Sequence, residues 1–267
     1  MPRARTLVAS IPAPSSVPAG SPPPRELIRR PSFSACIAAI REPELYRNFA
    51  IHLFVMFPAA LVMCTIASRI DRSLGLPGIL PPVAAWLVGL GLIGAGGFWV
   101  WYVYGYLYLS GGGSPGTHVD GGPTALVDTG PYTAIRHPSV LGKLAGVIGL
   151  GVTFQSLTFL VGFVPILVAY SVVTNRYLQE RFCDQRFGRR YQLYRERVPM
   201  LIPRPAGIRR WLRDEAAVPE ELPREEQLPQ PTGIWMEFRG YLLGLGMLIG
   251  FFALLAWLAA NSGGGPG

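Results

Sequence analysis

Two segments of this chain combine residue types that suit ligand chemistry, and the first covers residues 130–142. A Gly-Pro pair predicts a turn, after which Arg136-His137-Pro138 stands at the start of an apolar helix. Pro138 suits the first helical position, so free backbone N–H groups and the positive end of the helix dipole lie beside Arg136 and His137. This combination predicts a pocket for an anion such as a carboxylate, with Gly142 letting a flat ligand approach the backbone. The alternative is a basic juxtamembrane anchor with a helix cap.

The second segment, residues 175–199, is basic and contains a carboxylate at Glu180. Arg176 and Glu180 are four residues apart and share one face of a regular helix. An aromatic stripe follows if the helix continues past the next glycine: Phe187, Tyr191 and Tyr194. The alternative is an amphipathic helix lying on anionic lipid. Glu180 argues mildly against that alternative, because anionic headgroups repel a carboxylate.

Two further patterns are better explained without a ligand. Gly89-Leu-Gly91-Leu-Ile-Gly94 has the letters of a dinucleotide-binding fingerprint. It lies inside a charge-free apolar stretch instead of between a strand and a helix, which favours close packing of helices. The three histidines are dozens of residues apart, with no cysteine at ligand spacing, so no metal site is predicted: His52, His118 and His137.

The composition places both segments in a membrane protein. Half of the 267 residues are hydrophobic and 15% are charged, against about a quarter charged in soluble domains. Four stretches are apolar enough to cross about 30 Å of hydrocarbon: Phe49–Ser68, Pro82–Leu109, Val140–Val173 and Tyr241–Ala260. The third is too long for one crossing and has a polar middle, Thr153–Ser156, which predicts a helical hairpin. We therefore expect an all-α polytopic bundle of five transmembrane helices, since backbone groups in lipid must be satisfied within each segment.

The distribution of arginine predicts the orientation. The chain has 24 basic and 16 acidic residues and a net charge of +8. Seven arginines precede the first predicted span, and thirteen lie between Arg176 and Arg239. Placing these segments in the cytoplasm puts the N-terminus and the site inside and the C-terminus on the opposite side. Topology thus explains the basic excess, and no nucleic-acid partner is expected.

The same patterns divide the chain into four parts. Residues 1–45 form a disordered basic segment, 46–204 the membrane core, 205–238 a Pro- and Glu-bearing linker, and 239–267 an additional membrane helix with a tail. Two GxxxG spacings in the last span, beginning at Gly240 and Gly246, at most hint at helix association. Membrane lipids are the expected surroundings of the core.

Taken in order, the two segments resemble the isoprenylcysteine carboxyl methyltransferase family. The residues that carry the resemblance are GPYxxxRHPxxxG, a helical hairpin, an acidic position and FGxxYxxYxxRVP, over roughly residues 80–204. That family belongs to the same membrane superfamily as the phospholipid N-methyltransferases. The resemblance implies a membrane enzyme that holds S-adenosylmethionine at its cytosolic face. The positions it assigns to the cofactor are Leu126, Val127, Tyr132, Arg136, His137, Pro138, Ser139, Val140, Gly142, Gln179 and Glu180.

The chain departs from the family pattern at two of these positions. The family often has Tyr where this chain has Val140, and it usually has a Glu-Glu pair where this chain has Gln179 and Glu180. The resemblance implies that the acidic position contacts the ammonium end of the cofactor and that an arginine one turn earlier faces the substrate. Arg176 and Glu180 are therefore the predicted catalytic pair.

Methyl transfer from a sulfonium is an in-line displacement that needs mostly alignment. A carboxylate acceptor needs no general base, only an arginine such as Arg176 to orient it. An amine or thiol must lose a proton, for which His137 is a candidate. We expect a lipidic or small-molecule acceptor, with carboxylate O-methylation favoured and N- or S-methylation open. An NADPH-dependent membrane reductase of the sterol-reductase type and a catalytically degenerate membrane scaffold are the alternatives.

Overall fold

The computed structural model of the chain describes residues 27–43, 45–46, 54, 57–112, 123, 125–219 and the single positions 246, 250, 253 and 257. Over these residues the protein is all-helical, as predicted, with no strand. The α-helices are α1 (Phe33–Ala38), α3 (Phe57–Ser73), α4 (Pro82–Gly111), α5 (Pro138–Thr153), α6 (Val164–Thr174), α7 (Glu180–Arg197) and α8 (Pro205–Leu212). Short turns of 3-10 or π-helix link them: η1 (Ala39–Arg41), η3 (Gly130–Thr133), η4 (Phe159–Phe163) and η5 (Asn175–Gln179).

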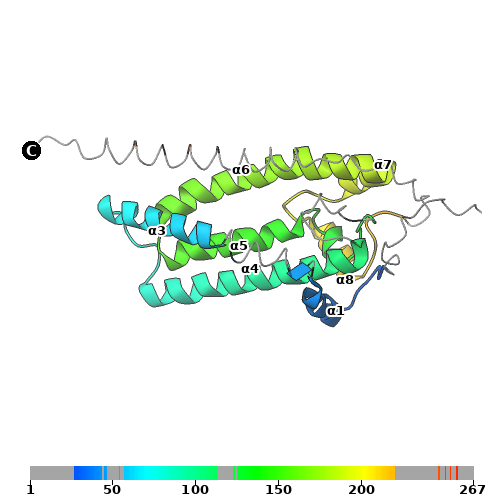
Figure 1. The fold of residues 1–267 in the computed structure, drawn as a ribbon, viewed down its shortest axis with the longest axis horizontal. Coiled ribbons are helices and arrows are strands. Elements are labelled where there is room, and N and C mark those ends of the chain that lie inside the picture. The colour runs from blue at the N-terminus through cyan, green and yellow to red at the C-terminus, as the bar shows by residue number, and fades with distance from the viewer. Residues whose placement is uncertain are drawn as a thin grey trace, which may run out of the picture.

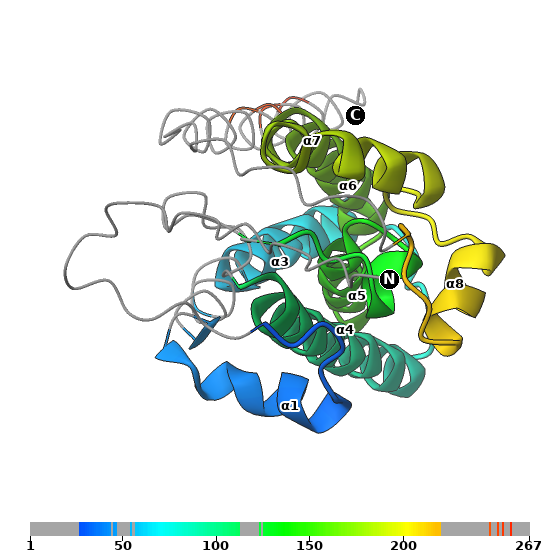
Figure 2. The same ribbon diagram turned by 90° about the vertical axis from the view of Figure 1, so that its right-hand side faces the viewer.

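The helices form an elongated bundle whose two ends are built from different helices (Figure 1). α4 and α5 run side by side along the long axis, and α6 continues through η5 into α7 as one long column above them. α3 lies at one end of the bundle, and α1 and α8 lie at the other (Figures 1 and 2). The residues of the first predicted segment lead into α5 at this second end, where α7 also begins.

Within the described residues, two stretches are long and apolar enough to cross a membrane: Pro82–Gly111 and Phe159–Tyr177. The helical hairpin predicted over Val140–Val173 is present, with its polar tip in the turn after Thr153, but its first arm has only 16 residues. α3 begins at Phe57, so the start of the first predicted span lies outside the described residues, as do His52 and nearly all of the fifth span. Five crossings and the cytoplasmic placement of the site thus stay predictions.

α4 has an exposed apolar half and a buried half. It begins with Pro82 at its first position and ends at Gly112, whose left-handed φ of 72° lets its N–H bond to the carbonyl of Tyr108. The large exposed hydrophobic side chains of α4 all lie between Val83 and Phe98. Beyond Phe98, most α4 side chains are buried under α1 and the loop that precedes α5. The boundary of the apolar band on α4 is therefore at Phe98.

Glycines let α4 and α5 approach closely. A Cβ placed on Gly149 of α5 would stand 2.6 Å from the carbonyl oxygen of Gly89, and one on Gly142 would stand 2.6 Å from that of Gly96. Each helix thus uses two glycines seven residues apart, which keeps them on one face. By contrast, Gly91 and Gly94 meet nothing within 4 Å. The packing interpretation of the GxGxxG letters is therefore confirmed at Gly89.

A buried carboxylate holds the tip of the hairpin against α3. Asp71 is 4% exposed and accepts hydrogen bonds from Ser156 Oγ at 2.6 Å and from the backbone N–H of Thr158 at 3.2 Å. The hydroxyl of Thr158 also donates to Asp71. Ser156 Oγ in turn accepts from the N–H of Phe159. These bonds satisfy donors at the start of the second arm, where a helix has no internal acceptors.

Substituting Asp71 with asparagine is expected to destabilise the hairpin. The amide keeps the shape of the carboxyl group but replaces one acceptor oxygen by a donor, so a buried hydroxyl loses its partner. We expect a loss of about 1–3 kcal/mol in the free energy of unfolding, measured by thermal unfolding in detergent. Arg72→Gln, on the exposed side of the same helix, is the control and should change stability little.

The chain after α7 is folded, where the sequence predicted a linker from residue 205. α8 packs on η3, and a Cβ on Gly207 would stand 2.7 Å from the carbonyl oxygen of Thr133. Further along, Ala217 and Val218 are buried in a cluster with Tyr191 and Tyr194. α7 is kinked at Gly188, where φ is 47°, so the regular helix that the predicted aromatic stripe required is interrupted between Phe187 and Tyr191. Similarly, α1 is helical within the segment 1–45 that was predicted to be disordered. We name residues 199–218 the strap, because both of its ends bond to the loop before α5.

Candidate functional site

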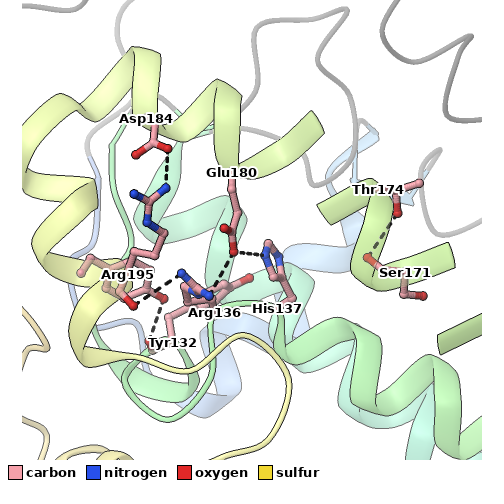
Figure 3. Close-up of polar contacts among 9 residues, drawn as sticks. Tyr132, Arg136, His137, Ser171, Thr174, Glu180, Asp184 and Arg195 are labelled. Carbon is pink, nitrogen blue, oxygen red and sulfur yellow. Dashed lines mark hydrogen bonds and ion pairs between the residues drawn. The ribbon is translucent and has the colours of Figure 1, made fainter. Parts of the chain in front are cut away.

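The structure brings the two predicted segments together at Glu180. Its Oε1 lies 3.2 Å from a terminal guanidinium nitrogen of Arg136 and 3.6 Å from Nε2 of His137 (Figure 3). The side chains of Arg136 and Glu180 are only 11% and 7% exposed. The start of α5 and the start of α7, more than 40 residues apart in the sequence, thus meet in one buried cluster of charge.

The loop before α5 is held from both sides. Gly130 takes a φ of +57°, which opens the 3-10 turn η3, and Thr133 Oγ1 donates to the carbonyl of Gly130 at 2.8 Å. At the end of the loop, the N–H of Arg136 donates to the carbonyl of Pro199 at 2.9 Å, which lies in the strap. On the membrane side, Trp99 Nε1 donates to the carbonyl of Pro138 at 2.7 Å. These bonds direct Arg136 and His137 toward α7.

A π-helical turn places Glu180. η5 (Asn175–Gln179) has the wider i→i+5 pattern, and Glu180 begins the α-helix that follows it. Arg176 and Glu180 differ in environment: Arg176 is exposed, whereas Glu180 is buried. The ion pairs of Glu180 are with Arg136 and His137 from another element. The structure therefore brings Glu180 together with Arg136 and His137, three of the residues predicted to bind the cofactor, and leaves Arg176 outside this charge cluster.

The cluster has a defined charge state near neutral pH. Burial lowers the pKa of His137 and outweighs the contact with Glu180, so the imidazole is neutral. Burial by itself would raise the pKa of Glu180, but the contact with His137 and the charge of Arg136 outweigh it, so the pKa lies below its ordinary value. Glu180 is thus ionised beside one arginine and a neutral imidazole.

Acidification is expected to destabilise the protein through these two groups. The folded-state pKa of His137 lies below its ordinary value of 6.5, so the unfolded chain takes up a proton first as the pH falls below about 6.5. Glu180 adds a second loss below its ordinary value of 4.5. Thermal unfolding between pH 8 and pH 5 should therefore show a falling Tm. His137→Gln should flatten the part of the curve around pH 6, and an unchanged curve would contradict the assignment.

The other residues predicted to bind the cofactor differ in how deeply they are buried. Val127 and Tyr132 are buried in a cluster with Tyr106 of α4, and the carbonyl of Tyr132 accepts from the hydroxyl of Tyr194 at 2.8 Å. Pro138 and Val140 are buried in the first turn of α5. The remaining three are partly exposed: Leu126, Ser139 and Gln179.

Gly142 has a clear structural reason to be glycine. The position of its missing side chain lies against α4, where Gly96, Val100 and Trp99 all stand within 3 Å of it. Contact between the two helices thus accounts for this glycine, and its contact with a cofactor stays a prediction.

The structure also contains polar contacts that no spacing in the sequence indicated. Arg190 of α7 pairs with Asp128 at 3.2 Å, and the carbonyl of Asp128 accepts from the N–H of Ala217. Arg195 pairs with Asp184 at 2.6 Å (Figure 3). The first pair joins residues 62 positions apart, so only the tertiary fold relates them. The contacts of Asp128 fasten α7 and the strap to the loop before α5, whereas the pair of Arg195 with Asp184 lies within α7.

Several buried polar atoms of the cluster keep unused hydrogen-bonding capacity. Arg136 Nε, His137 Nε2 and Glu180 Oε1 have no partner of hydrogen-bond geometry within the part of the chain that the structure describes. In addition, the side chain of His137 makes no cap bond to α5. Buried polar atoms without such bonds are uncommon and need an explanation. A polar ligand at this end of the bundle would supply the missing partners.

Comparison with protein families accounts for this arrangement. The family model described as phospholipid methyltransferase matches residues 84–190, which include α4, α5, the hairpin, η5 and Glu180. Comparison with curated proteins and with solved structures gave no match. The members of this family are membrane proteins, in accord with the two apolar helices. Residues 84–190 of the chain thus match the phospholipid methyltransferase family, the family of the isoprenylcysteine and phospholipid methyltransferases.

Proposed function

We propose that the protein is an S-adenosylmethionine-dependent methyltransferase that modifies a lipidic or small-molecule acceptor at the membrane. The observation that carries the proposal is the buried contact of Glu180 with Arg136 and His137 at the start of α5, inside the segment that matches the family. Three ionisable groups with unused hydrogen-bonding atoms suit a ligand that has both an ammonium and a carboxylate. S-adenosylmethionine is such a ligand.

The residues present fit the cofactor by charge. Glu180, ionised at neutral pH, would hold the ammonium end, and Arg136 with the first turn of α5 would hold the carboxylate. Tyr132, Val127 and Val140 would provide the apolar wall around the rest. When bound, the cofactor would supply a methyl group on a sulfonium sulfur. The sulfur departs as a neutral thioether, which is a good leaving group. The protein therefore has to align the acceptor more than to move protons.

A carboxylate acceptor suits the groups of this site best. Arg176 is exposed next to the buried cluster and can orient an anionic acceptor. A carboxylate already carries the electron pair that attacks the methyl group, so no base is needed. Amine or thiol acceptors require a base, and the neutral imidazole of His137 is the available one. Since α6 has no buried residue, an acceptor with an apolar chain can lie along it.

The family match favours methyl transfer over hydride transfer. Purified protein in detergent with native lipids, incubated with methyl-labelled S-adenosylmethionine, should yield a labelled lipid or small acid that mass spectrometry identifies. Glu180→Gln should abolish the label. Consumption of NADPH without any labelled product would favour the reductase. Absence of cofactor binding by calorimetry, in a protein that unfolds cooperatively, would favour the non-catalytic scaffold.

Arg176 allows a test that separates the acceptor from the cofactor. Arg176→Gln is expected to lower kcat/KM for an anionic acceptor by about 10- to 100-fold, the value of one charge-assisted hydrogen bond. Because Arg176 lies outside the charge cluster, cofactor affinity and Tm should not change. Arg181→Gln is the matched control, since Arg181 is also exposed and lies over the ring of Tyr177. Equal losses in both variants would contradict the role of Arg176.

A further inference from the structure

The eight residues of α8 have three distinct rows of side chains. One row, Gly207 and Trp211, attaches the helix to the protein: Gly207 lies against η3, and Trp211 packs edge-on against Trp99 of α4 with ring centroids 5.6 Å apart. The next row, Ile208 and Leu212, is apolar and exposed, with Leu212 at 79%. Just before the helix, Ile202 is 81% exposed. Exposed aliphatic side chains gathered at one place are unfavourable in water, and such a patch marks a surface that contacts a membrane or a partner.

The third row is basic. Arg209 and Arg213 are four residues apart and exposed beside the apolar row, and Arg204 precedes the helix. Arg213 has only a distant, exposed contact with Glu215 at 3.9 Å. Among the described residues, no carboxylate forms an ion pair with Arg204 or Arg209. An apolar row beside an unneutralised basic row is the pattern of a helix that lies in a membrane interface.

The position of α8 along the bundle agrees with this pattern. The apolar band on α4 ends at Phe98, and Trp211 packs on Trp99, the next residue. Tryptophan is enriched at the boundary between hydrocarbon and headgroups. Figure 2 looks along the bundle axis from the end that contains the site. In this view α8 lies at the edge of the bundle and is seen from its side. It thus lies across the bundle axis at the level where headgroups begin.

We propose that α8 is an interfacial helix that binds the headgroups of anionic phospholipids through Arg204, Arg209 and Arg213. The apolar row enters the outer part of the acyl region, and the guanidinium groups contact lipid phosphates. This surface is separate from the charge cluster of the site, and it does not require the proposed reaction. It nevertheless touches the site loop, because the strap that contains α8 bonds to the loop at Arg136 and at Asp128.

A lipid-contact measurement tests the proposal without any activity. A fluorophore is attached to Leu212→Cys, and the protein is placed in nanodiscs of phosphatidylcholine and phosphatidylglycerol in fixed proportion, with the quenching bromine on one lipid or the other. Cys36 and Cys64 are buried, and labelled wild-type protein gives the background from Cys183. We expect brominated phosphatidylglycerol to quench about twofold or more strongly than brominated phosphatidylcholine at equal mole fraction, because each arginine at the surface favours anionic lipid.

Matched variants make the result specific. Adding Arg209→Gln and Arg213→Gln should equalise the quenching by the two lipids. Arg69→Gln with Arg72→Gln, exposed at the other end of the bundle, removes the same charge and should leave the preference intact. Equal quenching in the protein with native arginines would show lipid contact without selection and would overturn the proposal. An absence of quenching by either lipid would place α8 in water and would also overturn it.

Discussion

Glu180→Gln is expected to cause the largest loss of any single substitution in the site. The change removes the negative charge that faces Arg136 and His137 and leaves a guanidinium that is 11% exposed without its carboxylate. Breaking a buried ion pair from one side costs about 3–5 kcal/mol. The same change removes the proposed partner of the cofactor's ammonium group. Thermal unfolding and calorimetry with S-adenosylmethionine measure the two effects.

A second variant separates stability from binding. Arg136→Gln alone should destabilise the fold by a similar amount, because it leaves the carboxylate unpaired. The double variant, Glu180→Gln with Arg136→Gln, contains neither charge and should recover most of the lost stability. It should still fail to bind the cofactor. If the double variant bound as tightly as the wild type, Glu180 would be only a structural partner of Arg136.

Gly149→Ala is expected to disrupt the contact of α4 with α5. The new Cβ would stand 2.6 Å from the carbonyl oxygen of Gly89 and 2.9 Å from a side-chain carbon of Ile93. Both neighbours belong to one helix and cannot move apart independently, so the helices must separate. Overpacking of this kind costs about 1–3 kcal/mol, and the same separation reaches the start of α5, where His137 stands. We expect a lower Tm and weaker cofactor binding.

Gly146→Ala on the same helix is the matched control, since nothing lies within 4 Å of the added Cβ. Alanine favours helix by up to about 1 kcal/mol over glycine, so this variant should keep or raise the Tm. The opposite signs of the two effects distinguish packing from helix propensity. A loss of equal size in both would show that the α4–α5 contact is not as close as described.

The parts of the fold that were predictable depend on local signals. The start of α5 follows from Pro138, and the hairpin tip follows from polar residues within a long apolar stretch. The meeting of His137 with Glu180 followed from the family resemblance, which orders the motifs around a hairpin, and the structure confirms their contact. In each case the informative residues are neighbours in the sequence or belong to the ordered set of motifs that carries the family resemblance.

The rest depends on contacts that sequence spacing does not encode. Arg176 and Glu180 were predicted to act as a pair, but Glu180 is buried against Arg136 and His137 of another segment while Arg176 is exposed. Asp71 belongs to none of the motifs found in the sequence, and its partners lie 85 and 87 positions away. Residues 205–218 of the strap fall in the segment 205–238 that was predicted to be a linker from its Pro and Glu residues, and the bond of Ala217 to the loop before α5 makes them part of the folded protein.

The unbroken course of α4 connects the proposed site with the apolar part of the same helix. Trp99 directly follows the last large exposed hydrophobic side chain of α4 and donates to the carbonyl of Pro138, so His137 lies beside the point where the apolar band ends. From Trp99, α4 continues for another twelve residues to Gly111, roughly 18 Å at 1.5 Å each. In a bilayer that α4 spans, the proposed reaction would therefore take place close to the headgroups, where an acceptor could keep its apolar chain among the lipid tails.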